Sequence, residues 1–310
     1  MFTFTKLTQA LVVAGVSFLA GNAHADAYAV ATDNIRNGAV TPTAGISVGV
    51  SASNSSSAAS LNGSGISFAA IGFNPNAPVS ALGGAAGRPN ELGGPPYYTL
   101  FGNSRTDYSW GDAIVNQEQT LTEKISARNA AETRLVNAGF GNGDGTNKSS
   151  TLLTVGQCAG GCSLSFAFEA DPYIMSRVDA LASPGSVARG TLGFSISLTR
   201  VSDGAIAFNW SPNGAAGGIV GGIELSDPES LNLTLTAFEN QTLTHSGPYA
   251  AGTFNSYSAR TDTLAAGQYT LSLFMNEKTD VVQVVPEPET YALMLAGLGA
   301  IGFLARRRKS

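Results

Sequence analysis

The sequence predicts a mostly β protein: an antiparallel β-sandwich or jelly-roll-like body between an N-terminal signal helix and a short C-terminal transmembrane helix. Three features of the 310 residues indicate this class: short runs that alternate apolar residues with Ser and Thr, Gly- and Asn-rich connectors between them, and one apolar segment at each end. Alternation with a period of two produces a strand with one buried and one solvated face. Many such strands joined by turns favour antiparallel sheets packed face to face.

The N-terminal segment, residues 1–25, has the pattern of a secretory signal peptide. Lys6 is its single charged residue, Leu11 to Gly21 is nearly continuous apolar sequence, and an A-x-A site ends at Ala25. A cationic start, a short apolar core and small residues before a cut site are typical of such signals. A membrane anchor is disfavoured because a span needs roughly 18 to 20 apolar residues. We expect the secretion translocon and signal peptidase as partners, with cleavage between Ala25 and Asp26.

The body, residues 26–285, contains the alternating runs. These are Ile46–Val50, Ser163–Phe168, Thr191–Leu198, Leu231–Phe238 and Tyr269–Phe274. The Gly-rich stretches 141–147 (GNGDGTN) and 211–218 (SPNGAAGG) are predicted to be turns between strands. Residues 116–136 fit either a helix or strands, and the pattern leaves both open. The Pro/Gly-rich segment 74–96 is predicted to be a long loop or linker, which could separate an N-terminal hairpin from the main sandwich.

The C-terminal segment, residues 286–310, joins three unlike parts. Pro286, Glu287 and Pro288 come first, an apolar run from Tyr291 to Ala305 follows, and Arg306, Arg307, Arg308 and Lys309 close it. As a helix, the apolar run would be about 23 Å long, shorter than a hydrocarbon core of roughly 30 Å. The basic cluster is held on the cytoplasmic side, so the run can stop transfer although it makes a marginal anchor. The prolines keep the preceding backbone extended.

These three parts, in this order, resemble the PEP-CTERM sorting signal of Gram-negative bacteria. The resemblance implies that an exosortase, an integral-membrane cysteine transpeptidase, cleaves near the Pro-Glu-Pro motif and passes the protein to the cell surface. It also implies a setting of exopolysaccharide and biofilm. We therefore expect an exported protein that is transiently anchored in the inner membrane, then placed on the cell surface or in the extracellular matrix. A plain C-terminal anchor is the alternative.

A weaker resemblance covers parts of the body. The stretches Tyr108–Ile114, Ala131–Leu135 and Ser165–Pro172 are similar to a group of exosortase-dependent surface proteins, which implies a β-rich fold without assigned chemistry. Leu264–Leu271 resembles the closing strand found before many such tails.

Charge excludes one class of partner. Without the ends, 12 cations and 20 carboxylates remain, a net charge of −8 spread without long runs. Nucleic acid is therefore a poor partner.

The sequence suggests no catalytic site, metal site or cofactor. Once His24 leaves with the signal, His245 is the single histidine, too few for a typical zinc site. A carboxylate pair, Glu169 and Asp171, could serve glycoside hydrolysis with Trp110 or Trp210 stacking on a sugar, but a simple strand end explains the two acids as well. The 141–147 stretch lacks the closing acid of an EF-hand loop.

The two cysteines, Cys158 and Cys162, bracket three small residues between two strand-like runs. In a hairpin their Cβ atoms would face each other within disulfide reach, and such a bond persists outside the cytoplasm. A redox-active or metal-binding pair is the alternative.

Together these features predict a structural protein of the cell surface or matrix that is not an enzyme. A carbohydrate-binding module, with exopolysaccharide as a possible partner, is the second reading, and a glycoside hydrolase the third.

Overall fold

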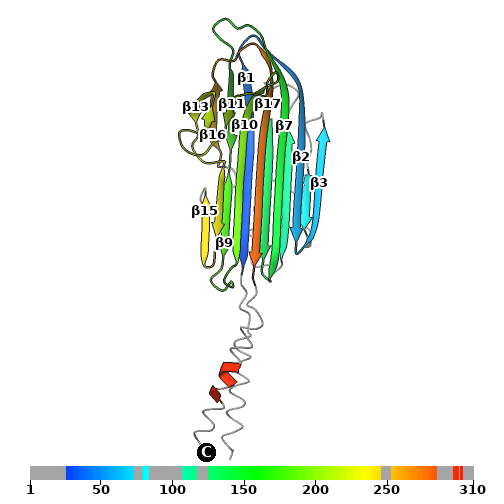
Figure 1. Ribbon diagram of the computed structural model, residues 1–310, viewed down its shortest axis with the longest axis vertical. Helices are drawn as coiled ribbons and strands as arrows, with labels where there is room; N and C mark the ends of the chain where they lie inside the picture. The colour runs from blue at the N-terminus through cyan, green and yellow to red at the C-terminus, as the bar shows by residue number, and fades with distance from the viewer. Residues whose placement is uncertain are drawn as a thin grey trace, which may run out of the picture.

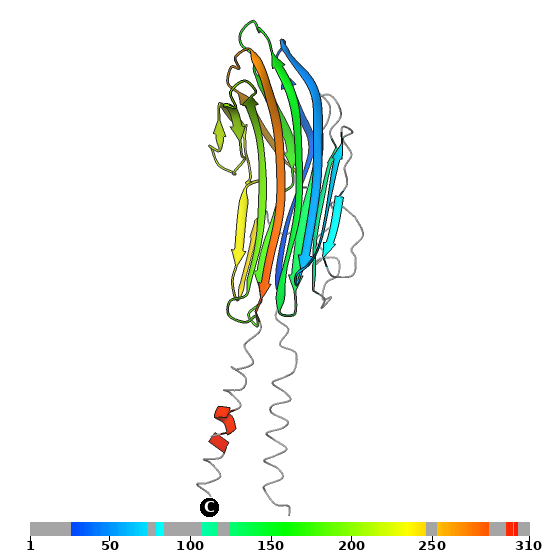
Figure 2. The same ribbon diagram turned by 45° about the vertical axis from the view of Figure 1, so that its right-hand side comes forward.

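The structure is a computed structural model that describes residues 26–72, 79–83, 107–116, 125–245, 253–284, 296–299 and 301–302. Figures 1 and 2 show two long β-sheets that lie face to face along a common axis. All strand pairs recorded between these elements are antiparallel. The prediction of a mostly β, antiparallel body consistent with a sandwich is confirmed. The predicted signal helix, 1–25, lies outside the described residues.

The first sheet has nine strands within the described part of the chain. In spatial order they are β13 (Gly222–Ser226), β16 (Asn255–Thr261), β8 (Leu164–Ala170), β1 (Ala27–Pro42), β6 (Ile125–Leu135), β5 (Tyr108–Asn116) and β4 (Val79–Gly83), while β9 (Tyr173–Val178) pairs with β1 and β15 (Gln241–His245).

The second sheet has eight strands within the same ranges. In order they are β12 (Ile219–Val220), β11 (Ile206–Trp210), β10 (Val187–Arg200), β17 (Gly267–Gln283), β7 (Gly139–Val155), β2 (Ile46–Leu61) and β3 (Ser64–Gly72), while β14 (Leu233–Ala237) pairs with β10.

The largest apolar cluster fills the half of the sandwich where β8 and β16 face β10 and β11. Alternate residues of β8 point inward, so Phe166 stacks on Phe208 with ring centroids 5.1 Å apart and Phe168 stacks on Tyr257 at 5.0 Å. Trp210 packs on the same ring of Phe168 at 5.6 Å. Aromatic pairs at such distances add to the stability gained by burying their area. This half is therefore an apolar core.

The prediction of a turn at residues 141–147 is wrong, because this stretch lies inside β7. Its glycines face the first sheet: a Cβ built on Gly143 would overlap the carbonyl oxygen of Trp110, and one on Gly145 would overlap that of Asp112. Sheets normally pack about 10 Å apart, with side chains between them. Here β7 and β5 approach backbone to backbone, and glycine is required for this contact rather than for a turn.

Two segments that the sequence left uncertain are now partly defined. In the open stretch 116–136, residues 125–135 form β6, so the strand alternative holds there. In the segment 74–96, residues 79–83 form β4, which pairs with β5, and the rest lies outside the described residues.

Both ends of the described body lie at one end of the sandwich, which we call the proximal end. The connection between β9 and β10, residues 179–186, contacts the first and the last residue of this body. Asp179 donates its backbone N–H to the Asp26 carbonyl oxygen (2.9 Å), and Val284 donates its N–H to the Ser186 hydroxyl (3.1 Å). The opposite, distal end carries the β1–β2 turn and the two cysteines. Figure 1 shows β17 running toward the proximal end.

Helical structure in the described part of the tail covers residues 296–299 and 301–302. Over the ranges that the structure describes, no helix is long and apolar enough to cross a membrane.

Candidate functional sites

The sorting signal begins directly after the last strand of the sandwich. Along its length β17 pairs with both β10 and β7, so it is a central strand whose backbone is held from two sides. Gln283, its last residue, is still buried, and Val284 is fixed by its bond to Ser186. Pro286–Pro288 and Arg306–Lys309 lie outside the described residues, whereas Leu298 and Ile301 in the helical turns are exposed. The signal therefore leaves the body from a rigid exit at the proximal end.

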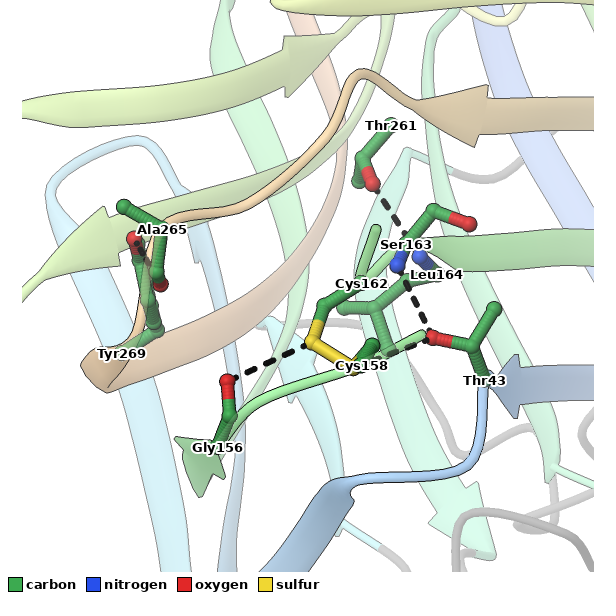
Figure 3. The surroundings of a disulfide bond; sticks show 9 residues. All are labelled: Thr43, Gly156, Cys158, Cys162, Ser163, Leu164, Thr261, Ala265 and Tyr269. Atoms are coloured by element: carbon green, nitrogen blue, oxygen red, sulfur yellow. Dashed lines mark hydrogen bonds between the residues drawn. A yellow bond between two sulfur atoms is a disulfide. The ribbon is translucent and has the colours of Figure 1, made fainter. Parts of the chain in front are cut away.

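The cysteines form the expected disulfide at the distal end (Figure 3), with Cα atoms 5.2 Å apart. The predicted hairpin around them is wrong, because β7 lies in the second sheet and β8 in the first. The bond closes a loop within the crossover between the sheets, where the buried Cys162 bridges to Leu264 and Ser163 is bonded to Thr43. The disulfide is a structural crosslink of the distal loops.

Replacing Cys158 with Ser is expected to loosen this loop without unfolding the sandwich. The closed loop is very short, so the loss of stability lies near the low end of about 0 to 5 kcal/mol. Hydrogen exchange of amides 156–164, compared with amides in β17, measures the local effect. Free thiols in freshly secreted wild-type protein would contradict the crosslink.

The structure places the residues considered for glycoside hydrolysis as follows. Glu169 points away from the core and forms an ion pair with Arg36 (2.6 Å). Asp171 follows the end of β8 and donates its backbone N–H to Asn34. Both tryptophans are buried, with Trp110 2% and Trp210 0% exposed, so neither can stack on a sugar.

His245 lies at the end of β15, and its Nε2 is 3.5 Å from Glu229 Oε1. Among the described residues, no group of three or more His, Cys, Asp or Glu side chains is placed to hold a metal ion.

A buried carboxylate with three aromatic donors lies on the outer face of the first sheet. Glu132 on β6 is fully buried and accepts hydrogen bonds from the Tyr28 and Tyr108 hydroxyls (2.8 Å each) and the Trp110 indole (2.9 Å). Burial, and then the charge of Glu132, raise the pKa values of both tyrosines, so their hydroxyls stay protonated and keep donating. We call this set the Glu132 network.

Asp26, the first residue after the expected signal cleavage, lies next to the Glu132 network. It binds Arg134 through two bonds of 3.0 Å, and both side chains are buried. Cleavage after Ala25 would thus place the new α-amino group beside a buried ion pair at the proximal end.

The Glu132 network was not predicted from the sequence, although several of its residues lie in stretches that were singled out there. Tyr108 and Trp110 lie in one of the stretches that resemble exosortase-dependent surface proteins, and Glu132 and Arg134 lie in another. In the structure these stretches are the paired strands β5 and β6, with Trp110 opposite Glu132. These two stretches therefore supply the residues of a buried hydrogen-bond network.

Comparison with known proteins supports the reading of the tail. Residues 284–309 match the PEP-CTERM protein-sorting motif, a span that begins where β17 ends. Searches of curated proteins and of solved structures found no match. The chain therefore carries, at the exit from its β-sandwich, the sorting signal of a PEP-CTERM, exosortase-sorted protein.

Proposed function

We propose that the protein is a structural component of the cell surface or extracellular matrix, without a catalytic role, which an exosortase releases from the inner membrane. The observation that carries the proposal is the PEP-CTERM motif directly after β17. Pro286–Pro288 follow the ordered exit at Val284 by one residue, and the two prolines in the sequence favour an extended peptide that a membrane-embedded enzyme can bind. The sandwich is the part that reaches the surface, with its disulfide end farthest from the membrane.

Replacing Glu287 with Ala is expected to leave full-length protein in the inner membrane. The apolar run still retains the chain, but the processing enzyme no longer recognises the motif. Membrane fractionation and blotting with an antibody to the sandwich measure the retained and released pools. Glu289→Ala removes a carboxylate just outside the motif and serves as the control. Release of the Glu287→Ala protein at the wild-type level would contradict recognition through the motif.

A second candidate function, carbohydrate binding, is favoured by the outer face of the second sheet. Its central strands present rows of hydroxyl and amide side chains: Asn142, Thr146, Ser150 and Thr154 on β7, Thr270 and Ser272 on β17, and Thr191, Ser195, Ser197 and Thr199 on β10. Phe274 stands among them, 36% exposed, with Lys148 Nζ 5.4 Å from its ring centroid. A face rich in hydrogen-bonding side chains with an exposed aromatic ring suits a polysaccharide chain.

A glycan array together with a panel of polysaccharide substrates separates the candidate functions. Specific binding that is lost in Phe274→Ala and kept in Phe140→Ala, an exposed Phe at the proximal end of the same face, would establish a binding module. Turnover of any substrate would contradict the non-catalytic role. Neither binding nor turnover is the result expected of a purely structural surface protein.

A further inference from the structure

Two carboxyl groups lie opposite each other between the two sheets. Asp33 on β1 is 2% exposed and Glu277 on β17 is 1% exposed, and both point inward. Asn129 connects them: it pairs in register with Asp33, and its Nδ2 reaches across to the carbonyl oxygen of Met275 on β17 (3.0 Å). The carboxyl groups therefore occupy one level of the interior, although they belong to different sheets.

Three of the four carboxylate oxygens of the two groups have no compensating partner among the described residues. Within the described ranges, Asp33 Oδ1 and both carboxylate oxygens of Glu277 have no hydrogen-bond partner. The amide of Asn129 lies near Glu277 and lowers its pKa. The hydrogen bonds of this amide nevertheless go to the carbonyl oxygens of Gly145 and Met275. For a buried carboxyl group without compensating partners, the charged form is strongly disfavoured.

Among the described residues, the other titratable groups that act on the pair are carboxyl groups. Asp171 and Glu229 act on Asp33, Asp144 on β7 acts on Glu277, and Tyr257 on β16 lies close to Asp33. Lys278, beside Glu277 in sequence, points to the outer face and is 3.4 Å from Asp144. On β10, which packs against β1, the inward side chains next to this level are apolar: Leu192 and Phe194.

We propose that Asp33 and Glu277 form a buried proton-binding pair, of which at least one member is protonated at neutral pH, and that loss of this proton as the pH rises loosens the sandwich. An exported protein meets the pH outside the cell directly. The pair would make the rigidity of the surface protein depend on that pH.

The electrostatics of the two groups support the pair. Burial, followed by the charges of Asp171 and Glu229, raises the pKa of Asp33 from 3.8 to about 7, against the backbone N–H of Asn34, which lowers it. Burial and then Asp33 raise the pKa of Glu277 well above its ordinary value. Because the native state binds these protons more tightly than the unfolded state, stability is complete below about pH 4. It falls as the pH rises toward the folded pKa near 7.

A small cavity beside the pair can admit water when a carboxyl group ionises. About 40 Å³ of space lies between the sheets, lined mainly by apolar side chains, among them Ile35, Ala127 and Met275. Each of these residues is two positions from Asp33, Asn129 or Glu277 on the same strand face. Water that enters this space on deprotonation can solvate the charges, at the expense of the packing between the sheets.

Urea unfolding of the full-length chain in detergent micelles tests the proposal, with circular dichroism as the readout. For Asp33 alone, the rise of its pKa on folding predicts that the unfolding equilibrium constant increases about a hundredfold between pH 5 and pH 8. Asp33→Asn and Glu277→Gln should each reduce this dependence and stabilise the protein at the higher pH. Asp280→Asn, which removes an exposed carboxylate from the same strand, should leave it unchanged.

Three results would overturn the proposal. The isosteric variants could fold and keep the full wild-type pH dependence. Calcium ions at pH 8 could stabilise the wild type and not the variants, which would make the pair a cation site. If neither variant folds, infrared spectroscopy of the wild type decides: a protonated carboxylic acid band at pH 7 that disappears at higher pH is expected, and its absence contradicts the pair.

Discussion

Replacing Gly143 with Ala is expected to destabilise the sandwich by more than about 3 kcal/mol and to reduce the secreted yield sharply. The added Cβ would overlap the carbonyl oxygen of Trp110 and come within 3.1 Å of Thr279 Oγ1. The first of these atoms is backbone, so the overlap cannot be relieved by a change of rotamer. Overpacking in a core typically costs about 1 to 3 kcal/mol, and here β5 and β7 must also separate.

The matched control is Gly193→Ala on β10. A Cβ there meets only the carbonyl oxygen of Asn276, at 3.4 Å, which is an ordinary contact. Since Ala restricts the unfolded chain more than Gly does, the control should be neutral or slightly stabilising. Urea unfolding followed by circular dichroism gives both values. Equal midpoints for the two variants would show that the sheets do not approach as closely as β5 and β7 do in the structure.

Replacing Glu132 with Ala is expected to cost about 3 to 5 kcal/mol. The change removes the Glu132 acceptor from two buried tyrosine hydroxyls and one buried indole N–H, and losing such a bond costs about 1 to 3 kcal/mol. Glu132→Gln keeps one carbonyl oxygen for two donors but turns an NH₂ group toward the third, so an intermediate loss is expected. The free energy of unfolding, measured in urea, ranks the variants.

The control for this substitution is Glu239→Ala, because Glu239 is exposed in the β14–β15 turn. It should change the free energy of unfolding by less than about 0.5 kcal/mol. The Glu132 network also predicts that quenching of Trp110 fluorescence by acrylamide increases in Glu132→Ala. A Glu132→Ala protein as stable as the control would mean that the network contributes nothing to the fold.

The fold class could be predicted from the sequence because the alternation of apolar and polar residues in a strand follows the burial of its two faces. The alternation in Thr191–Leu198 matches the burial pattern of β10, residue by residue. The tail could likewise be recognised, since a proline pair, an apolar run and a basic cluster are all local features. Residues 284–309 bear out that prediction.

The pairing of the strands could not be predicted, because it depends on contacts between distant segments. Gly143 and Gly145 have the composition of a turn, and only their contact with β5 shows why a long strand contains them. The cysteines illustrate the same limit: the disulfide was expected, but the strands on either side belong to different sheets. Glu132 is a further example, because its donor Tyr28 lies 104 residues away in the sequence and no local pattern predicts their hydrogen bond.

The mass of the mature protein recovered from the cell surface tests the sorting function most directly. Intact-mass and terminal-peptide spectrometry of the wild type should find an N-terminus at Asp26 and a C-terminus between Val285 and Glu289, with residues 291–310 removed. Surface protein that still carries Arg306 to Lys309 would contradict the account and make the tail a simple anchor.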